Sequence, residues 1–262
     1  MEKFINYNKR QIKKYVKEVD GFGTYFVVDN FIDKQFFEKL NEELLEIKAN
    51  SGKLIDRTSK CTPMGYGVDK QIGGGDKAFS VKLDKFKHWK SFLKLIYSLK
   101  FKEFMFSVWE DTSFYEKLSE QYKKTNTGCK LSFQTDGYGW PIHPDSLKKV
   151  ISFLFYLDNR NWLDDSKGGT DLWKVTNNLV EWDREENSMD YYLRKEKDAK
   201  KEASLDRRHA DYIEKFKSID FVPNRLVGFV RTNTSYHSIP LRKLPDGVTR
   251  DCFQVNVWDK NN

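Results

Sequence analysis

Residues 142–157 read IHPDSLKKVISFLFYL, and the fold and the chemistry that we expect both follow from this segment. His143 and Asp145 are two residues apart, so on a strand their side chains point to the same face. The end of the stretch, 149–157, is a nearly continuous apolar run, which is typical of a strand buried on both faces. The stretch therefore predicts buried β-structure with two polar side chains at its entrance.

A second histidine with the same potential follows far along the chain. His237 follows His143 by 94 residues, whereas we expect His88 in a basic helix and His209 in a solvated, charged segment. Two imidazoles and one carboxylate that leave coordination positions open are the ligands of non-haem Fe(II) that activates O₂. Each residue alone has a structural alternative, such as a polar strand end or a turn cap at Asp145. Together they predict a metal site, and with it an oxygenase.

The composition is that of one well-packed protein. The 262 residues are 39% hydrophobic and 15% aromatic, enough for one sizeable core. The three cysteines are widely spaced and form no C-x-x-C pair, which argues against a disulfide framework or a zinc ribbon and favours a reducing compartment. We find neither a signal-peptide pattern nor an apolar run long enough to span a bilayer. We therefore expect a cytoplasmic protein without membrane insertion.

The net charge of +7 is concentrated in one segment. Residues 70–102 contain nine Lys against two Asp, and the rest of the chain is balanced. Because aromatic residues are interleaved with these lysines, this basic strip could contact a polyanion such as nucleic acid. The simpler interpretation is an amphipathic helix near 84–98 with its aromatic side chains toward the core and its lysines solvated. We favour the helix, since a nucleic-acid partner has no support beyond the strip.

The N-terminal half predicts helices and loops around one early strand. Residues 24–28 favour a strand, and Asp33 can cap a helix that carries apolar residues at helical spacing. The glycine-rich residues 50–83 predict an irregular loop. Two further helices are expected near 86–99 and 112–124.

From residue 130 the pattern changes to short strands separated by turn signals, which is typical of a sandwich or barrel. The expected strands are 131–134, the His143 strand, 149–157, one after the Gly168-Gly169 turn, 225–231 and 250–258. A charged, helix-favouring segment at 181–217 predicts a helical insertion, either a lid over the site or a plain solvated excursion. The simplest organisation is a single domain, 1–262, in which residues 1–129 support a core at 130–258.

Several motifs occur in a fixed order. They are the opening Tyr25–Phe31, His143-Pro144-Asp145, Phe155-Tyr156-Leu157, Trp162, Gly168-Gly169, Asn224–Phe229, Ser235-Tyr236-His237 and Thr249-Arg250. This ordered set resembles the 2-oxoglutarate/Fe(II)-dependent dioxygenases, and more closely their prolyl-hydroxylase-like branch. The resemblance covers roughly residues 24–45 and 130–258.

The resemblance implies an α+β protein with a double-stranded β-helix (jelly-roll) core, N-terminal flanking helices and a helical insertion. It implies that His143, Asp145 and His237 are catalytic and bind the metal. The implied cofactor is Fe(II), with 2-oxoglutarate and O₂ as co-substrates. The implied reaction hydroxylates a substrate and releases succinate and CO₂.

The resemblance also implies that Arg250 pairs with the far carboxylate of 2-oxoglutarate, which needs a charge partner when it is buried. Arg250 follows His237 by 13 residues rather than the usual about ten, and the Leu-Pro-Asp-Gly turn between them can absorb the difference. Arg242 is nearer but lies on the loop side of that turn, so we favour Arg250. Gln134, which stands where many relatives have a tyrosine, and Ser152 are further candidates for the co-substrate site.

The sequence does not specify the substrate, because pocket loops decide it within such a fold. We expect a small molecule or a peptidyl residue, with Tyr138 and Trp140 as a candidate pocket wall or as plain packing. Two other functions remain open. One is a cupin-type metalloenzyme, although cupins generally use more histidines at the metal. The other is a catalytically silent jelly roll that binds a polyanion through residues 70–102.

Overall fold

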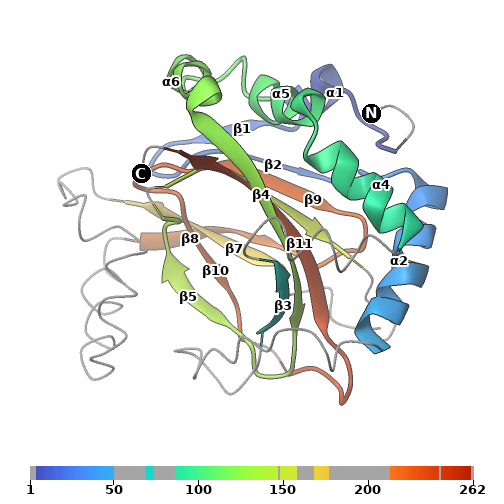
Figure 1. Cartoon of the computed structure of the whole chain (residues 1–262). Coiled ribbons are helices and arrows are strands. Elements are labelled where there is room, and N and C mark those ends of the chain that lie inside the picture. Colours follow the sequence, from blue (N-terminus) through green and yellow to red (C-terminus); the bar gives the residue numbers. More distant parts are fainter. Residues whose placement is uncertain are drawn as a thin grey trace.

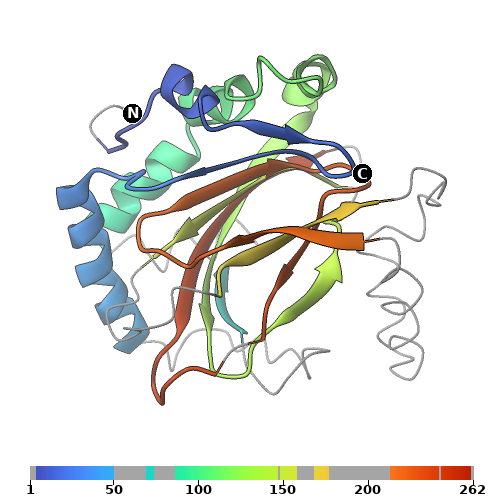
Figure 2. The same cartoon turned by 180° about the vertical axis from the view of Figure 1, so that it is seen from behind.

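The structure, a computed structural model, describes residues 4–49, 69–73, 86–146, 148–157, 168–176, 213–241 and 243–260. Two antiparallel sheets face each other, and helices lie along the outer side of the larger sheet (Figures 1 and 2). None of the helices in these ranges combines the length and the apolar character needed to cross a membrane.

The larger sheet has seven strands and the smaller sheet has four. The larger sheet runs in the order β1 (Lys17–Val19), β2 (Gly23–Val28), β9 (Leu226–Val230), β6 (Lys149–Tyr156), β11 (Arg250–Asp259), β4 (Thr125–Gln134) and β3 (Asp69–Gly73). The smaller sheet runs in the order β5 (Trp140–His143), β10 (Tyr236–Ile239), β7 (Thr170–Val175) and β8 (Ile213–Ile219). The expected mixture of helices with short strands is confirmed.

The described helices lie in the first half of the chain, and several of them begin at identifiable caps. They are α1 (Lys9–Lys13), α2 (Lys34–Ala49), α4 (Lys87–Ile96), α5 (Leu99–Ser107), α6 (Tyr115–Gln121) and the 3₁₀ turn η2 (Tyr122–Lys124). The carboxylate of Asp33 accepts the amide hydrogen of Phe36 at 3.0 Å, which confirms the predicted start of α2. Glu43 on α2 accepts the backbone N–H groups of His88 and Trp89, so one helix caps the next.

Strand β6 separates two hydrophobic cores, as its apolar run predicted. Phe153 and Phe155 pack in a core with the helices, whereas Leu154 and Tyr156 pack in a second core between the two sheets. This alternation follows from the period of two along a strand. The strand that follows Asp145 is therefore held firmly on both faces.

The basic strip is, where it is described, mainly an amphipathic helix. α4 buries Trp89 and Phe92 completely or almost so, while Lys87 and Lys94 remain exposed. The simpler of the two interpretations of residues 84–98 is thus confirmed.

Two expectations about secondary structure are wrong, and one helix was not predicted. A separate helix, α5, fills the gap between the two expected helices, because the Ser98 hydroxyl caps it by accepting the amide hydrogen of Phe101 at 3.1 Å. Residues 69–73 form strand β3 on the edge of β4, and residues 213–217 belong to β8 beside β7. In both cases pairing with a neighbouring strand overrides weak local propensity. The rest of the expected insertion, up to residue 212, lies outside the described residues.

Candidate metal centre and co-substrate pocket

Strand pairing in the smaller sheet brings the two distant histidines together. β5 pairs antiparallel with β10, and His143 lies directly opposite His237. Their rings have centroids 4.4 Å apart. Both side chains are buried, because this face of the smaller sheet is turned toward the larger sheet.

Asp145 completes the cluster from the loop after β5. It is 2% exposed, and its Oδ1 lies 3.9 Å from Nε2 of His237. One potential ligand atom from each of His143, Asp145 and His237 lies within 4.8 Å of the other two, close enough for one metal ion. The structure thus brings together the three residues that the sequence singled out.

Burial and charge set the protonation states of these side chains. Burial by itself raises the pKa of Asp145, but the charge of Lys149 and of the imidazoles, when protonated, outweighs it and holds this pKa far below its ordinary value. Burial lowers the pKa of His237, and the opposing effects of Asp145 and the Ser235 carbonyl do not compensate for it. An ionised carboxylate beside a neutral imidazole is the protonation state that metal ligation requires.

Both oxygens of the Asp145 carboxylate have protein partners. The Ser152 hydroxyl donates to Oδ2 at 2.8 Å, and the Lys149 ammonium lies 2.5 Å from Oδ1. Ser152 Oγ also lies 3.0 Å from the side-chain amide of Asn256. The contacting atom of Asn256 is Oδ1, an acceptor, and because a hydroxyl has one proton to donate we assign that proton to the ionised carboxylate of Asp145, the stronger acceptor. Ser152 therefore contacts the candidate metal ligand and not Arg250, and neither Lys149 nor Asn256 was predicted.

Arg250 is a buried cation whose partners are uncharged. It is 4% exposed at the start of β11, where its Nε donates to the Gly168 carbonyl at 2.7 Å and one Nη donates to the Gly169 carbonyl at 2.9 Å. Its other Nη donates to the side-chain oxygen of Gln134, the second residue that the sequence assigned to the co-substrate site. No carboxylate among the described residues forms an ion pair with Arg250, and N–H groups remain for a ligand. The planar guanidinium also lies against the rings of Tyr156 and Phe221.

A small cavity connects Arg250 with the strand that carries His237. It is lined by Gln134, Thr135, Tyr138, Ile239, Pro240, Leu244 and Arg250. Ile239 lies two residues after His237 on β10, so both side chains point to the same face. Tyr138 thus lines the pocket at Arg250. Trp140 lies instead against His143, with ring centroids 5.9 Å apart.

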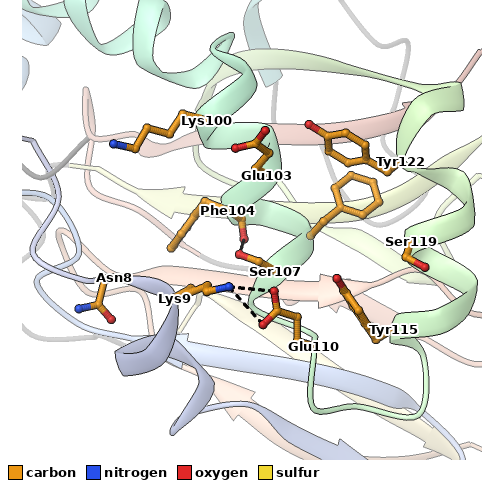
Figure 3. A pocket seen from close by; sticks show the side chains of 11 residues that line it. Asn8, Lys9, Lys100, Glu103, Phe104, Ser107, Glu110, Tyr115, Ser119 and Tyr122 are labelled. Carbon is orange, nitrogen blue, oxygen red and sulfur yellow. Dashed lines mark hydrogen bonds and ion pairs between the residues drawn. The ribbon is translucent and has the colours of Figure 1, made fainter.

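A larger pocket of about 590 Å³ lies away from this site, among α1, α5, α6 and η2 (Figure 3). No member of the metal cluster lines it. Its Glu110 is already ion-paired with Lys9, at 3.0 Å, and with Lys13, at 2.8 Å. With balanced lysines and glutamates on its wall, this pocket does not select a ligand of one charge, and we do not assign the chemistry to it.

The donor set at the cluster fits a non-haem iron and a 2-oxo acid. Two imidazoles and one carboxylate provide three ligands and leave coordination positions open, which is the arrangement of Fe(II) oxygenases. A dicarboxylate that reached from this metal toward Arg250 would meet a buried guanidinium with N–H groups to spare, which matches a bidentate contact. The three-residue cluster fits the Fe(II), and Arg250 fits the 2-oxoglutarate, that the motifs implied.

Comparison with known proteins identifies the fold. No family model matches the sequence, and no curated protein matches it. Among solved structures, the non-heme alpha ketoglutarate dependent epimerase SnoN from nogalamycin biosynthesis superposes with a TM-score of 0.56, 9% identity, and coverage of 96% of this chain and 83% of that one. A Pseudomonas putida prolyl-4-hydroxylase superposes with a TM-score of 0.51, 10% identity, and coverage of 96% and 98%.

A third similar structure contains a peptide. The prolyl hydroxylase from Trichoplax adhaerens, in complex with a hypoxia inducible factor oxygen degradation domain peptide fragment, has a TM-score of 0.50, 12% identity, and coverage of 97% of this chain and 91% of that one. These similarities extend over nearly the whole chain. The chain therefore has the fold of the 2-oxoglutarate-dependent non-haem oxygenases and prolyl hydroxylases, as its motifs led us to expect.

Proposed function

We propose that this chain is a 2-oxoglutarate- and O₂-dependent oxygenase that hydroxylates its substrate at a non-haem Fe(II). In this proposal its two facing sheets form a double-stranded β-helix core within a single domain, residues 1–262. The observation that carries the proposal is the His143–Asp145–His237 cluster together with the buried Arg250, which forms no ion pair with a carboxylate among the described residues and lines a cavity that reaches the strand of His237. The similarity of fold supports it independently.

The metal would be bound by the three residues of the cluster, His143, Asp145 and His237. When bound, Fe(II) with 2-oxoglutarate and O₂ supplies the oxidation of a substrate C–H bond, with release of succinate and CO₂. Ser152 keeps the Asp145 carboxylate oriented by donating to Oδ2. That contact leaves Oδ1 as the oxygen that faces the imidazole of His237.

Arg250 would hold the far carboxylate of the co-substrate. Its guanidinium is fixed before the co-substrate arrives, because two glycine carbonyls and Gln134 already accept its hydrogen bonds. A pre-organised donor loses little conformational entropy on binding. The rings of Tyr156 and Phe221 exclude water from one side of the guanidinium and so strengthen its attraction for a carboxylate.

The substrate we propose is a small molecule or a peptidyl residue. The Trichoplax adhaerens enzyme was solved with a peptide, which supports the peptidyl class, whereas SnoN is an epimerase and so the fold supports other outcomes. Trp140, half-buried beside His143, is our candidate for a substrate contact. Tyr138 is nearer to the co-substrate, since it lines the cavity at Arg250.

Two alternatives have less support. A cupin-type metalloenzyme would call for a further histidine ligand, and within the described ranges His88 instead pairs with Glu43 at 2.8 Å. A catalytically inactive jelly roll that binds a polyanion would not require the buried cluster or the buried Arg250.

The test is oxygen-dependent conversion of 2-oxoglutarate. Purified protein with Fe(II), ascorbate, 2-oxoglutarate and air should release succinate slowly by itself and faster with a true substrate from a screen of amino acids and peptides. The Asp145→Ala variant should release none, because it lacks the anionic ligand. Succinate release at the parent rate by this variant would refute the assignment of the site.

A further inference from the structure

We propose that Lys149 is an internal counter-cation, which occupies the metal-facing oxygen of Asp145 in the metal-free protein and competes with the metal for that oxygen. The inference rests on the proposed metal site and concerns how tightly that site binds its ion. It would make metal affinity a property set by a side chain that is not a ligand.

The contact is made to the oxygen that matters for the metal. Lys149 Nζ lies 2.5 Å from Asp145 Oδ1, which is also the oxygen 3.9 Å from His237 Nε2. The other oxygen, Oδ2, accepts the hydrogen bond from Ser152. The side chain of Lys149 is only 14% exposed, so the ammonium lies inside the site and not at its surface.

A bulge in strand β6 directs Lys149 to this place. Along the pairing with β11, Ile151 lies opposite Val257, but the next pair is Lys149 opposite Trp258, so Val150 is an extra residue. In a regular strand Lys149 and Ser152 would point to opposite faces, because they are three residues apart.

The extra residue reverses that relationship. Ser152 lies opposite Asn256, and Lys149 opposite Trp258, and these two β11 residues share one face. Lys149 therefore points to the same side as Ser152, toward Asp145, while Val150 packs in the core beneath the helices. Bulges commonly re-aim a side chain next to a functional site. The backbone is thus shaped to deliver this ammonium to the carboxylate.

Electrostatics then predicts competition. A buried carboxylate needs a countercharge, and Lys149 provides it when no metal is present. A divalent ion on Oδ1 would lie close to the ammonium and repel it. Nζ already lies 5.4 Å from the Trp258 ring centroid while it contacts Asp145, and the flexible lysine chain can keep this cation–π contact when the ammonium moves away from Oδ1. Metal binding must therefore displace Lys149, and this displacement lowers the affinity.

The alternative is that Lys149 only positions Asp145 and does not compete with the metal. If Lys149 served only to orient Asp145 for the metal, its removal would weaken metal binding. The two roles thus predict changes of opposite sign for the same substitution.

The experiment titrates Mn(II), a redox-inert substitute for Fe(II), into metal-free protein by calorimetry, and records the thermal midpoint without metal. The variants are Lys149→Met, Lys149→Arg and the matched control Lys148→Met, whose side chain is exposed next door. Lys149→Met should bind Mn(II) at least about tenfold more tightly, or about 1.4 kcal/mol, and should melt at a lower temperature without metal. Lys148→Met and Lys149→Arg should stay close to the parent in both measurements.

If Lys149→Met does not fold without metal, Lys149→Gln replaces it, since glutamine keeps an N–H donor for Asp145 but no charge. Equal or weaker Mn(II) binding by a folded, uncharged Lys149 variant would overturn the inference. A parent protein that binds no Mn(II) would instead refute the metal site itself, so the two failures are distinguishable.

Discussion

His143 and His237 are directly opposite each other on β5 and β10, with ring centroids 4.4 Å apart, although 94 residues separate them in the sequence. A strand pair is a stiff connection, so the distance between the two imidazoles does not depend on loop motion. Strand pairing therefore brings together the two histidines of the candidate metal centre, and Asp145 joins them from the loop after β5.

Removal of either histidine should abolish metal binding. We expect His143→Ala and His237→Ala to weaken Mn(II) binding by more than roughly a hundredfold. Each variant loses a metal ligand itself, and loss of a residue that only hydrogen-bonds to a ligand already lowers metal affinity by about tenfold to a hundredfold. Calorimetric titration of the metal-free protein measures this directly. His88→Ala, which removes a histidine from the helical side, should bind Mn(II) like the parent. Retention of parent affinity in either cluster variant would show that the histidines are structural.

Ser152→Ala should weaken metal binding more mildly, by about tenfold to a hundredfold, because Asp145 loses the hydrogen bond that orients it. The matched control is Ser132→Ala, since Ser132 is equally buried but its hydroxyl has no partner among the described residues. The control should keep the parent Mn(II) affinity. If both serine variants lose affinity equally, a general loosening of the core and not the contact with Asp145 is responsible.

Tyr156 gives a pH-dependent prediction that does not involve the metal. Burial raises the pKa of Tyr156 from 10.0 to about 12. Between these values the unfolded chain loses the tyrosine proton and the folded protein keeps it, so stability falls as pH rises from about 10 toward 12, by about 1.4 kcal/mol per pH unit. Below about pH 10 Tyr156 is protonated in both the folded and the unfolded state, so it causes no change of stability with pH.

The measurement is urea unfolding of the parent and Tyr156→Phe at pH 8 to 11. At pH 8 the variant should be less stable by about 1 kcal/mol, since it loses the 2.7 Å hydrogen bond to Thr170. Because phenylalanine cannot ionise, the difference should shrink above pH 10. Tyr15→Phe, an exposed control, should follow the parent throughout. A difference that stays constant up to pH 11 would mean that Tyr156 ionises as easily in the folded protein as in the unfolded chain.

Much of the site could be predicted from the sequence because its elements carry local signals. The apolar run at 149–157 predicted β6, and the His-x-Asp pair predicted two side chains on one face. The order of motifs singled out Arg250, and the structure shows it buried and hydrogen-bonded to Gln134.

The contacts that the sequence could not reveal depend on partners far along the chain. The role of Lys149 depends on a bulge against β11, about a hundred residues later, and regular alternation would have placed it on the wrong face. Strand β3 forms only because β4 offers it an edge. The start of α4 is capped by Glu43 on another helix, which no local capping pattern could indicate. The sequence named Ser152 as a candidate for the co-substrate site, but its contact with Asp145 depends on the fold and was not predicted.

The proposed function requires a metal at the three-residue cluster and a 2-oxo acid that reaches from this metal to Arg250. The most direct measurement is the visible spectrum of anaerobic protein titrated with Fe(II) and then 2-oxoglutarate. The parent should develop a weak metal-to-ligand charge-transfer band that needs both additions. Arg250→Ala should require at least about a hundredfold more 2-oxoglutarate, because leaving one member of a buried charge pair unpaired costs about 3–5 kcal/mol, while Arg242→Ala should resemble the parent. No band in the folded parent, or an unchanged titration in Arg250→Ala, would contradict the account.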